Sequence, residues 1–188
     1  MPPPSILPKI RQWADGCQSC TGCPLHTLNK RKITHRYSIV HPGRVDVLFV
    51  GEGPGKSENA CGEPFVPDAP AGETLQDLIQ DSIPPTKSYL ITNSVLCTPW
   101  KDNSLSDIGK PKSDQIKACS TNLRELIDRI KPRHIVALGR DAEKALKHLK
   151  LDYIYISHPS AINRAKDFNY EYSSARLTLS GIYNPVKV

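Results

Sequence analysis

The sequence predicts an α/β fold of three layers, in which helices cover both faces of a four-stranded parallel sheet. Short apolar runs rich in β-branched residues alternate along the chain with segments whose apolar residues recur at the helical period. Such alternation favours parallel pairing through crossover connections. The strand runs are apolar throughout, which is typical of a sheet that is covered on both faces.

Four strands and three helices are expected, in alternation. The strands are the apolar runs at residues 45–50, 89–95, 134–139 and 153–157. The first helix covers residues 72–81, with Leu75, Leu78 and Ile79 on one face. The second begins at Ser113, a residue type that caps helices, and runs to about Ile130. The third covers residues 141–149. Residues 1–44 are expected to be mostly irregular, and residues 51–70 and 98–112 are expected to be loops.

Length and composition indicate a globular chain. The 188 residues, 38% of them hydrophobic, suit a single domain that spans residues 1–188, with residues 1–44 as an arm. No apolar run approaches the roughly 20 residues of a membrane span, and residues 1–10 hold four prolines and no apolar export signal. We therefore expect a cytoplasmic protein with no membrane partner.

The positive charge is concentrated near the beginning of the chain. The formal net charge is +6, and residues 1–44 hold seven basic residues and one acid, whereas the remainder is balanced. Such a basic arm commonly meets phosphate groups, but it is also compatible with a solvated arm that binds nothing.

The six cysteines suggest a metal or redox centre rather than disulfides, because thiols stay reduced in the cytosol. Cys20 and Cys23 are separated by two residues, and Cys97 and Cys119 could complete a site of four thiolates. Cys17 and Cys20 form an overlapping pair. The spacing does not separate an iron–sulfur cluster from zinc, and Cys97 and Cys119 could instead be small buried apolar residues.

Several polar side chains are expected at the carboxyl ends of the strands, where ligands bind in open parallel sheets. A glycine-rich segment follows the first strand: Gly51-Glu52-Gly53-Pro54-Gly55. It matches neither a dinucleotide-binding motif nor a phosphate-binding P-loop. Glu52 could hold a water or act as a base, and the alternative is a solvated loop carboxylate.

Two further residues stand at strand ends. Asn93 could offer a donor and an acceptor to the edge of a nucleobase. His158, in the segment His158-Pro159-Ser160, could stabilise a developing oxyanion. Taken singly, each is more often structural: an asparagine in this position is more commonly a turn or cap residue, and a lone histidine is more commonly a structural one.

Together, however, these segments resemble the family 4 uracil-DNA glycosylases, the iron–sulfur members of the uracil-DNA glycosylase superfamily. The resemblance covers roughly residues 17–165. It rests on Gly51-Glu52-Gly53-Pro54-Gly55, Glu58, Gly62, Pro64-Phe65-Val66, Ala71-Gly72, Leu75, Asn93-Ser-Val-Leu-Cys97-Thr-Pro99, Cys119, the strand from Pro132 to Gly139, and His158-Pro159-Ser160.

The resemblance implies a monomeric DNA-repair enzyme that flips uracil out of DNA and hydrolyses its N-glycosidic bond. It implies a [4Fe–4S] cluster on Cys20, Cys23, Cys97 and Cys119. Phe65 is expected to stack on the uracil, Asn93 to read its edge, and His158 to stabilise the departing base. Glu52 is expected to position water. The remaining implied residues are Gly53 and Glu58 at the substrate, and Lys30, Arg31, Lys32, Ser160 and Arg164 at the DNA.

The sequence also departs from the family pattern. The segment from Pro64 to Gly72 is longer than usual and lacks a glycine after Val66, and the loop after Pro99 lacks the usual Asn/Arg-rich stretch. The sequence does not identify the side chain that fills the vacated space in the duplex, for which Ile162 or Arg164 could serve. Two other readings stay open: a catalytically silent or altered-specificity relative that binds DNA or a modified base, and a zinc-stabilised nucleic-acid-binding module.

Overall fold

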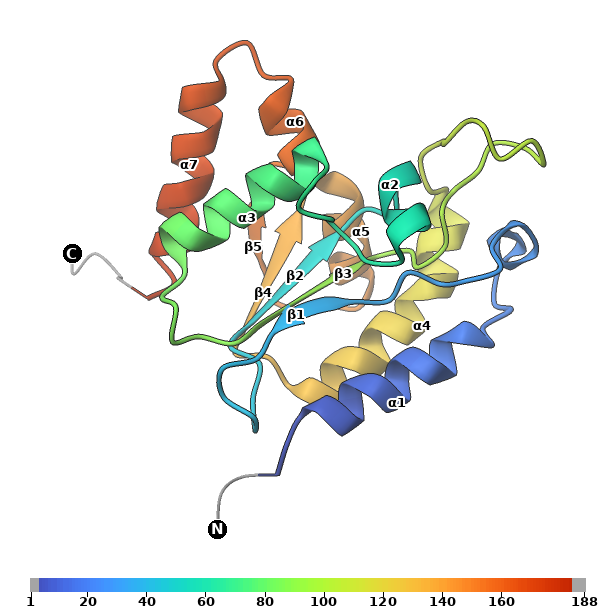
Figure 1. Ribbon diagram of the computed structural model, residues 1–188, viewed down its shortest axis with the longest axis horizontal. Helices are drawn as coiled ribbons and strands as arrows, with labels where there is room; N and C mark the ends of the chain where they lie inside the picture. Colours follow the sequence, from blue (N-terminus) through green and yellow to red (C-terminus); the bar gives the residue numbers. More distant parts are fainter. Residues whose placement is uncertain (1–3, 184–188) are drawn as a thin grey trace.

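The computed structural model describes residues 4–183, whose centre is a sheet of five strands (Figure 1). The ends of the expected domain, residues 1–3 and 184–188, lie outside the described residues. Four strands are parallel and follow the spatial order β3, β2, β4, β5, with bounds Tyr89–Asn93, Val47–Gly51, His134–Leu138 and Ile154–Ile156. The four expected parallel strands are therefore confirmed.

The expected strand number was one too low. A fifth strand, β1 (Arg36–Ser38), pairs antiparallel with β3 at the edge of the sheet. It has three residues, none of them fully buried, so it lacks the apolar run by which the other strands are recognised.

Helices cover both faces of the sheet, so the three-layer architecture is confirmed. One face carries α1 (Leu7–Gln18), α4 (Ser113–Ile130) and α5 (Arg140–His148), and the other carries α3 (Pro70–Ser82), α6 (Pro159–Asn163) and α7 (Phe168–Ser180). Alternate residues of β2 point to opposite faces: Leu48 packs with the first group of helices and Phe49 with the second.

The three expected helices are present with small shifts of their ends. Helix α4 has the expected bounds, but its N-cap is Lys112 rather than Ser113, and the Lys112 N–H donates to Gln115 Oε1 over 2.8 Å. The segment at 51–70 is not all loop, because α2 occupies Lys56–Cys61. Among residues 4–183, no helix is long and apolar enough to cross a membrane.

The N-terminal arm is more ordered than expected. It contains α1, a 3₁₀ helix η1 (Pro24–Leu28) and β1. Trp13 of α1 is 1% exposed, and its indole N–H donates to the Asn122 carbonyl of α4 over 2.8 Å. The arm is thus part of the hydrophobic core, and the expectation of a mostly irregular segment was wrong.

Candidate functional site

A cavity of about 480 Å³ opens at the carboxyl ends of the parallel strands. Its walls come from the glycine-rich segment after β2, from the residues between α2 and α3, and from the segment after β5. Glu52, Gly53, Glu58, Phe65, His158, Ser160 and Arg164, all expected at the site, line this cavity. The fold therefore brings together residues that are up to about a hundred positions apart in the chain.

His158 is held as a neutral imidazole with a defined orientation. It caps α6, and the Ser160 N–H donates to its Nδ1 over 3.1 Å. Burial, together with the charges of Arg164 and Lys110, lowers the pKa of His158 to about 4, against the opposing charge of Asp141. Because Nδ1 accepts a hydrogen bond, the ring proton resides on Nε2, which is then available as a donor.

Phe65 forms the aromatic wall of the cavity. Its ring centroid lies 5.5 Å from that of His158, and the side chain is almost fully buried. The residue has a φ of +51°, which bulky side chains rarely adopt. The Glu58 carboxylate accepts hydrogen bonds from the backbone N–H groups of Phe65 and Gly55. Glu58 therefore holds Phe65 in its unusual conformation.

Asn93 ends β3 next to Phe65. It is 1% exposed, and neither its amide nitrogen nor its amide oxygen has a hydrogen-bond partner among the described residues. It does not line the cavity wall itself but lies against Gly51, where a Cβ would collide with Asn93 Oδ1 and with the Phe65 ring. A buried amide with both ends unpaired is costly, which is typical of a group arranged to meet a ligand.

Glu52 lies on the cavity wall directly after β2. Burial raises its pKa, as does the charge of Asp141, whereas Lys110, Lys144 and Arg164 lower it. Its backbone oxygen accepts from the Ser94 hydroxyl over 2.6 Å, which ties the segment after β2 to the end of β3. This bond fixes the backbone of Glu52, and Glu52 and His158 line the same cavity.

Burial also raises the pKa of Glu58, whereas its two hydrogen bonds from backbone N–H groups and the charge of Arg36 oppose that rise. Both of its carboxylate oxygens are engaged by backbone N–H groups. The residue lies at the cavity, as expected, and its contacts are with the loop.

The four expected cysteine ligands line one small, mostly apolar cavity behind the arm. Burial raises the pKa of Cys97 to about 12 and that of Cys119 to about 11. The Asn122 side-chain N–H group lies 3.5 Å from Cys20 Sγ and 3.7 Å from Cys119 Sγ. The sequence analysis did not single out Asn122. The signal that could have identified it is its position one helical turn after Cys119, on the same face of α4.

The other two cysteines lie elsewhere. Cys17 is buried in the core beneath α1, and Cys61 is exposed; neither lines the cavity of the four. Within residues 4–183, no three cysteine, histidine or acidic side chains are gathered closely enough to hold one metal ion.

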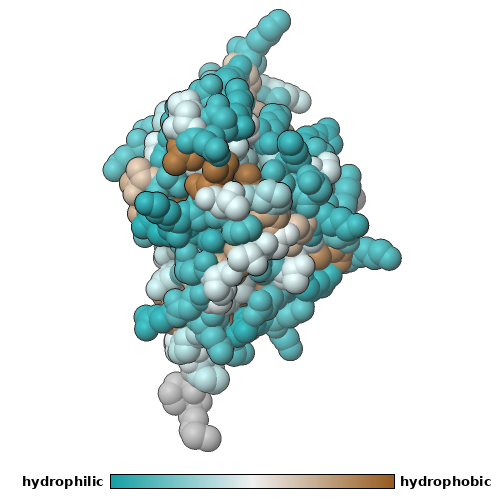
Figure 2. Space-filling model, turned by 90° about the vertical axis from the view of Figure 1, so that its right-hand side faces the viewer, coloured by the Kyte–Doolittle hydropathy of each residue, from teal (hydrophilic) through white to brown (hydrophobic). Residues whose placement is uncertain are grey.

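The basic residues expected at the DNA have different surroundings. Lys30 is exposed, and the Arg31 guanidinium donates to the Asn59 and Ala60 carbonyls while remaining exposed. Lys32 differs from the expectation of an exposed cation: it is 7% exposed and lines the cysteine cavity. The side of the molecule at the right of Figure 1 is mostly hydrophilic, with only small hydrophobic areas (Figure 2).

Ile162 cannot serve as the side chain that fills a vacated duplex site. It is fully buried against the second face of the sheet. Arg164, the other residue considered, is exposed at the cavity mouth.

Comparison with known proteins agrees with this geometry. Residues 38–178 match the model of the family described as Uracil DNA glycosylase superfamily. A type-4 uracil-DNA glycosylase of Sulfurisphaera tokodaii is 32% identical over 184 residues, which cover 95% of this chain and 74% of the relative. Type-4 uracil-DNA glycosylases of Pyrobaculum aerophilum and Thermotoga maritima are 33% and 36% identical over 70% and 66% of this chain.

The matches to the last two proteins span about three fifths of their length, 61% and 59% respectively. The family match, in contrast, contains β2, the cavity residues and His158 in a single stretch. With an aromatic ring, an amide and a neutral histidine at the carboxyl ends of a parallel sheet, this chain belongs to the uracil-DNA glycosylase superfamily.

Proposed function

We propose that this protein releases uracil from DNA by hydrolysing the N-glycosidic bond, leaving an abasic site. The observation that carries the proposal is the convergence of Phe65, Asn93 and His158 at one end of the sheet. The names of its relatives support the same activity. A base within a duplex is out of reach, so the uracil would be flipped into the cavity at a cost of a few kcal/mol.

In this proposal, Phe65 stacks on the flipped base and Asn93 reads its edge. The Asn93 amide offers a donor to uracil O4 and an acceptor to N3–H. Cytosine presents the reverse pattern, which would leave buried groups unpaired. The two free ends of the Asn93 amide support this role.

The departing uracil carries negative charge as the bond breaks, and the sugar carries positive charge. His158, neutral with its proton on Nε2, donates to the uracil oxygen on which that charge develops. Glu52 positions the attacking water and faces the positive sugar. Glu58 acts through Phe65, by holding the backbone that carries the ring. Gly53 lines the cavity in which the base would lie.

Lys30, Arg31, Ser160 and Arg164 would contact the DNA backbone, whose phosphates position a strand without reading its sequence. The substrate is then uracil-containing DNA, single- or double-stranded. The proposal includes a monomer in the cytoplasm, where the six cysteines would stay reduced.

The activity is tested with an oligonucleotide that carries one uracil, followed by alkaline cleavage of any abasic site. We expect strand scission with uracil, and none with thymine or cytosine at the same position. His158→Ala should slow release by roughly 10²–10³-fold, the scale for losing one oxyanion donor. Wild-type protein that releases no uracil from either form of DNA would favour the silent or altered-specificity relative instead.

We also propose that Cys20, Cys23, Cys97 and Cys119 hold a [4Fe–4S] cluster. The four thiols line one cavity, and a cluster there would cross-link the arm to α4 and to the end of β3. The high pKa values of Cys97 and Cys119 mean that these thiols stay protonated until metal displaces the protons.

Iron content and visible absorbance test this proposal. The purified protein should be brown and hold about four irons per chain. Cys97→Ala and Cys119→Ala should lose the colour, whereas Cys17→Ala and Cys61→Ala should keep it. A colourless protein with one zinc per chain would contradict the cluster, and loss of iron in Cys17→Ala with retention in Cys23→Ala would contradict the ligand set.

A further inference from the structure

A second cavity, of about 390 Å³, lies beside the proposed base-binding cavity. The two share Glu52, His158, Ser160 and Arg164. Beyond these, the second cavity is lined by Lys110 from the loop before α4, by the first turn of α5, and by the end of β5. A group bound there would therefore lie directly next to the proposed reacting bond.

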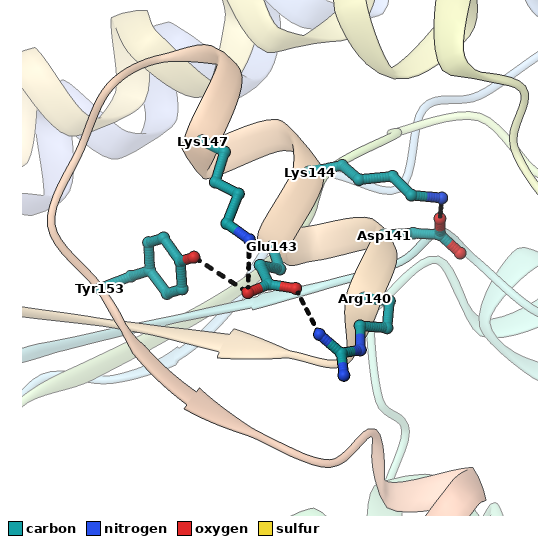
Figure 3. Close-up of polar contacts among 6 residues, drawn as sticks. All are labelled: Arg140, Asp141, Glu143, Lys144, Lys147 and Tyr153. Carbon is teal, nitrogen blue, oxygen red and sulfur yellow. Dashed lines mark hydrogen bonds and ion pairs between the residues drawn. The ribbon is translucent and has the colours of Figure 1, made fainter.

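Two of the acidic side chains around this second cavity, Asp141 and Glu143, have basic partners, whereas Glu52 forms no ion pair among the described residues. Asp141 pairs with Lys144 over 2.7 Å, and Glu143 pairs with Arg140 over 3.2 Å and with Lys147 over 3.0 Å (Figure 3). Arg140 also lies over the Tyr155 ring, 5.3 Å from its centroid. The Arg140 guanidinium is thereby held at the rim of the cavity, with most of its surface still exposed.

Two further cations have no such compensation. Within the part of the chain that the structure describes, neither Lys110 nor Arg164 forms an ion pair. Both charges lie close enough to Glu52 and His158 to influence these groups. Lys110 and Arg164 thus outnumber the one unpaired carboxylate of the cavity, Glu52, so positive charge is in excess beside the position where the sugar of a flipped nucleotide would lie.

The chemistry that fits is a singly charged oxyanion joined to that nucleotide. A metal cation is disfavoured by the unpaired Lys110 and Arg164, and an apolar group is disfavoured by the charged walls. In DNA, a phosphodiester is the group directly attached to the sugar. Lysine and arginine are the side chains that most often hold it.

We propose that the second cavity is a subsite for one backbone phosphate next to the flipped nucleotide, with Lys110 and Arg140 as its cations alongside Arg164. This rests on the proposed function, because the phosphate belongs to the strand that carries the uracil. Lys110 lies in the long loop between β3 and α4.

The test measures binding, so that it does not depend on catalysis. The probe is a fluorescent oligonucleotide whose uridine carries a 2′-fluorine, which disfavours the sugar cation and resists hydrolysis. Each phosphate near the uridine is replaced in turn by a neutral methylphosphonate. We expect one position at which this replacement weakens binding by wild type and reduces the slope of log Kd against log salt by about one.

Lys110→Gln and Arg140→Gln should each bind the unmodified probe more weakly than wild type does. In both variants, the methylphosphonate at that one position should weaken binding much less than it does in wild type. Both residues are exposed, so the variants are expected to fold, and iron absorbance checks this. The matched control is Lys87→Gln, a half-buried cation at the opposite end of the sheet over Tyr183, which should keep the full penalty.

The proposal would be overturned if, in both variants, each methylphosphonate weakened binding as much as it does in wild type. Affinities of Lys110→Gln and Arg140→Gln equal to those of Lys87→Gln would also overturn it. Failure of the proposed function has a different signature: wild-type protein would bind the probe but release no uracil from the unfluorinated oligonucleotide.

Discussion

At the scale of single residues, the sequence identified most of the cavity but not its finer arrangement. Asn93 and His158 were predictable because each follows a recognisable strand in a family-like segment. Nothing local to Lys110 or Asp141 reveals that they face Glu52, since a long loop and a helix turn bring them there. Lys32 was misplaced because a charge in a basic run gives no sign of being buried.

Asn93 illustrates a conflict between stability and function. Its amide is buried with both ends unpaired, so replacing it by an apolar group of similar size removes a desolvation cost. Asn93→Leu should raise the free energy of unfolding by about 1 kcal/mol, seen as a higher melting temperature, while abolishing uracil release.

The matched control is Asn29→Leu. The Asn29 amide is also buried, but it donates to the Leu25 and Thr98 carbonyls and accepts from the Thr98 N–H. This variant should lower the melting temperature. A lower melting temperature in Asn93→Leu as well would mean that the Asn93 amide is structural.

The pH dependence of uracil release should follow Glu52 rather than His158. The pKa of His158 is lowered to about 4, so the ring stays neutral, and able to donate, from pH 8 down to about 5. The pKa of Glu52 is raised, so its carboxylate is protonated, and activity is lost, as the pH falls towards this elevated value. Single-turnover rates across this range should show an acid limb in wild type and in His158→Gln.

Glu52→Gln should remove the acid limb and leave a slow, flat profile. Should the acid limb disappear in His158→Gln and remain in Glu52→Gln, the assignment of the two groups would be reversed.

At the scale of elements, periodicity found the helices and strands of the sheet layers but missed much of the arm. In α1, apolar residues recur at helical spacing, namely Leu7, Ile10, Trp13, Ala14 and Cys17. This periodicity predicts a helix, but the prolines and the three cysteines nearby led to the expectation of an irregular segment. Strand β1 and helix α2, in contrast, are too short to show a period.

The segment between α2 and α3 should depend on Glu58 for its shape. The Glu58 carboxylate accepts from two backbone N–H groups, and an amide in its place offers only one acceptor. Glu58→Gln should therefore displace the Phe65 ring and lower the single-turnover rate by up to about 10²-fold, with a smaller change in DNA affinity.

Glu63→Gln is the control for this prediction, because Glu63 is an exposed acid in the same segment. It should keep the wild-type rate. Equal rates for both variants would show that Glu58 does not position Phe65.

At the scale of the whole molecule, the fold places some of the basic residues of the arm at the surface and buries another. Lys30 and Arg31 are exposed beside α2, whereas Lys32 lies inside, at the cysteine cavity. The sequence showed the excess of charge but could not divide it, because the division depends on how the arm packs against α4.

Salt dependence of DNA binding separates these two groups of charges. Each phosphate contact releases counterions, so replacing Lys30 and Arg31 together by glutamine should reduce the slope of log Kd against log salt by about two. Lys32→Gln should leave the slope unchanged, because its ammonium faces Cys97 rather than solvent, and it should instead lower the iron content. A slope that falls with Lys32→Gln but not with the double variant would contradict this division, since it would place the DNA on the cysteine side of the arm.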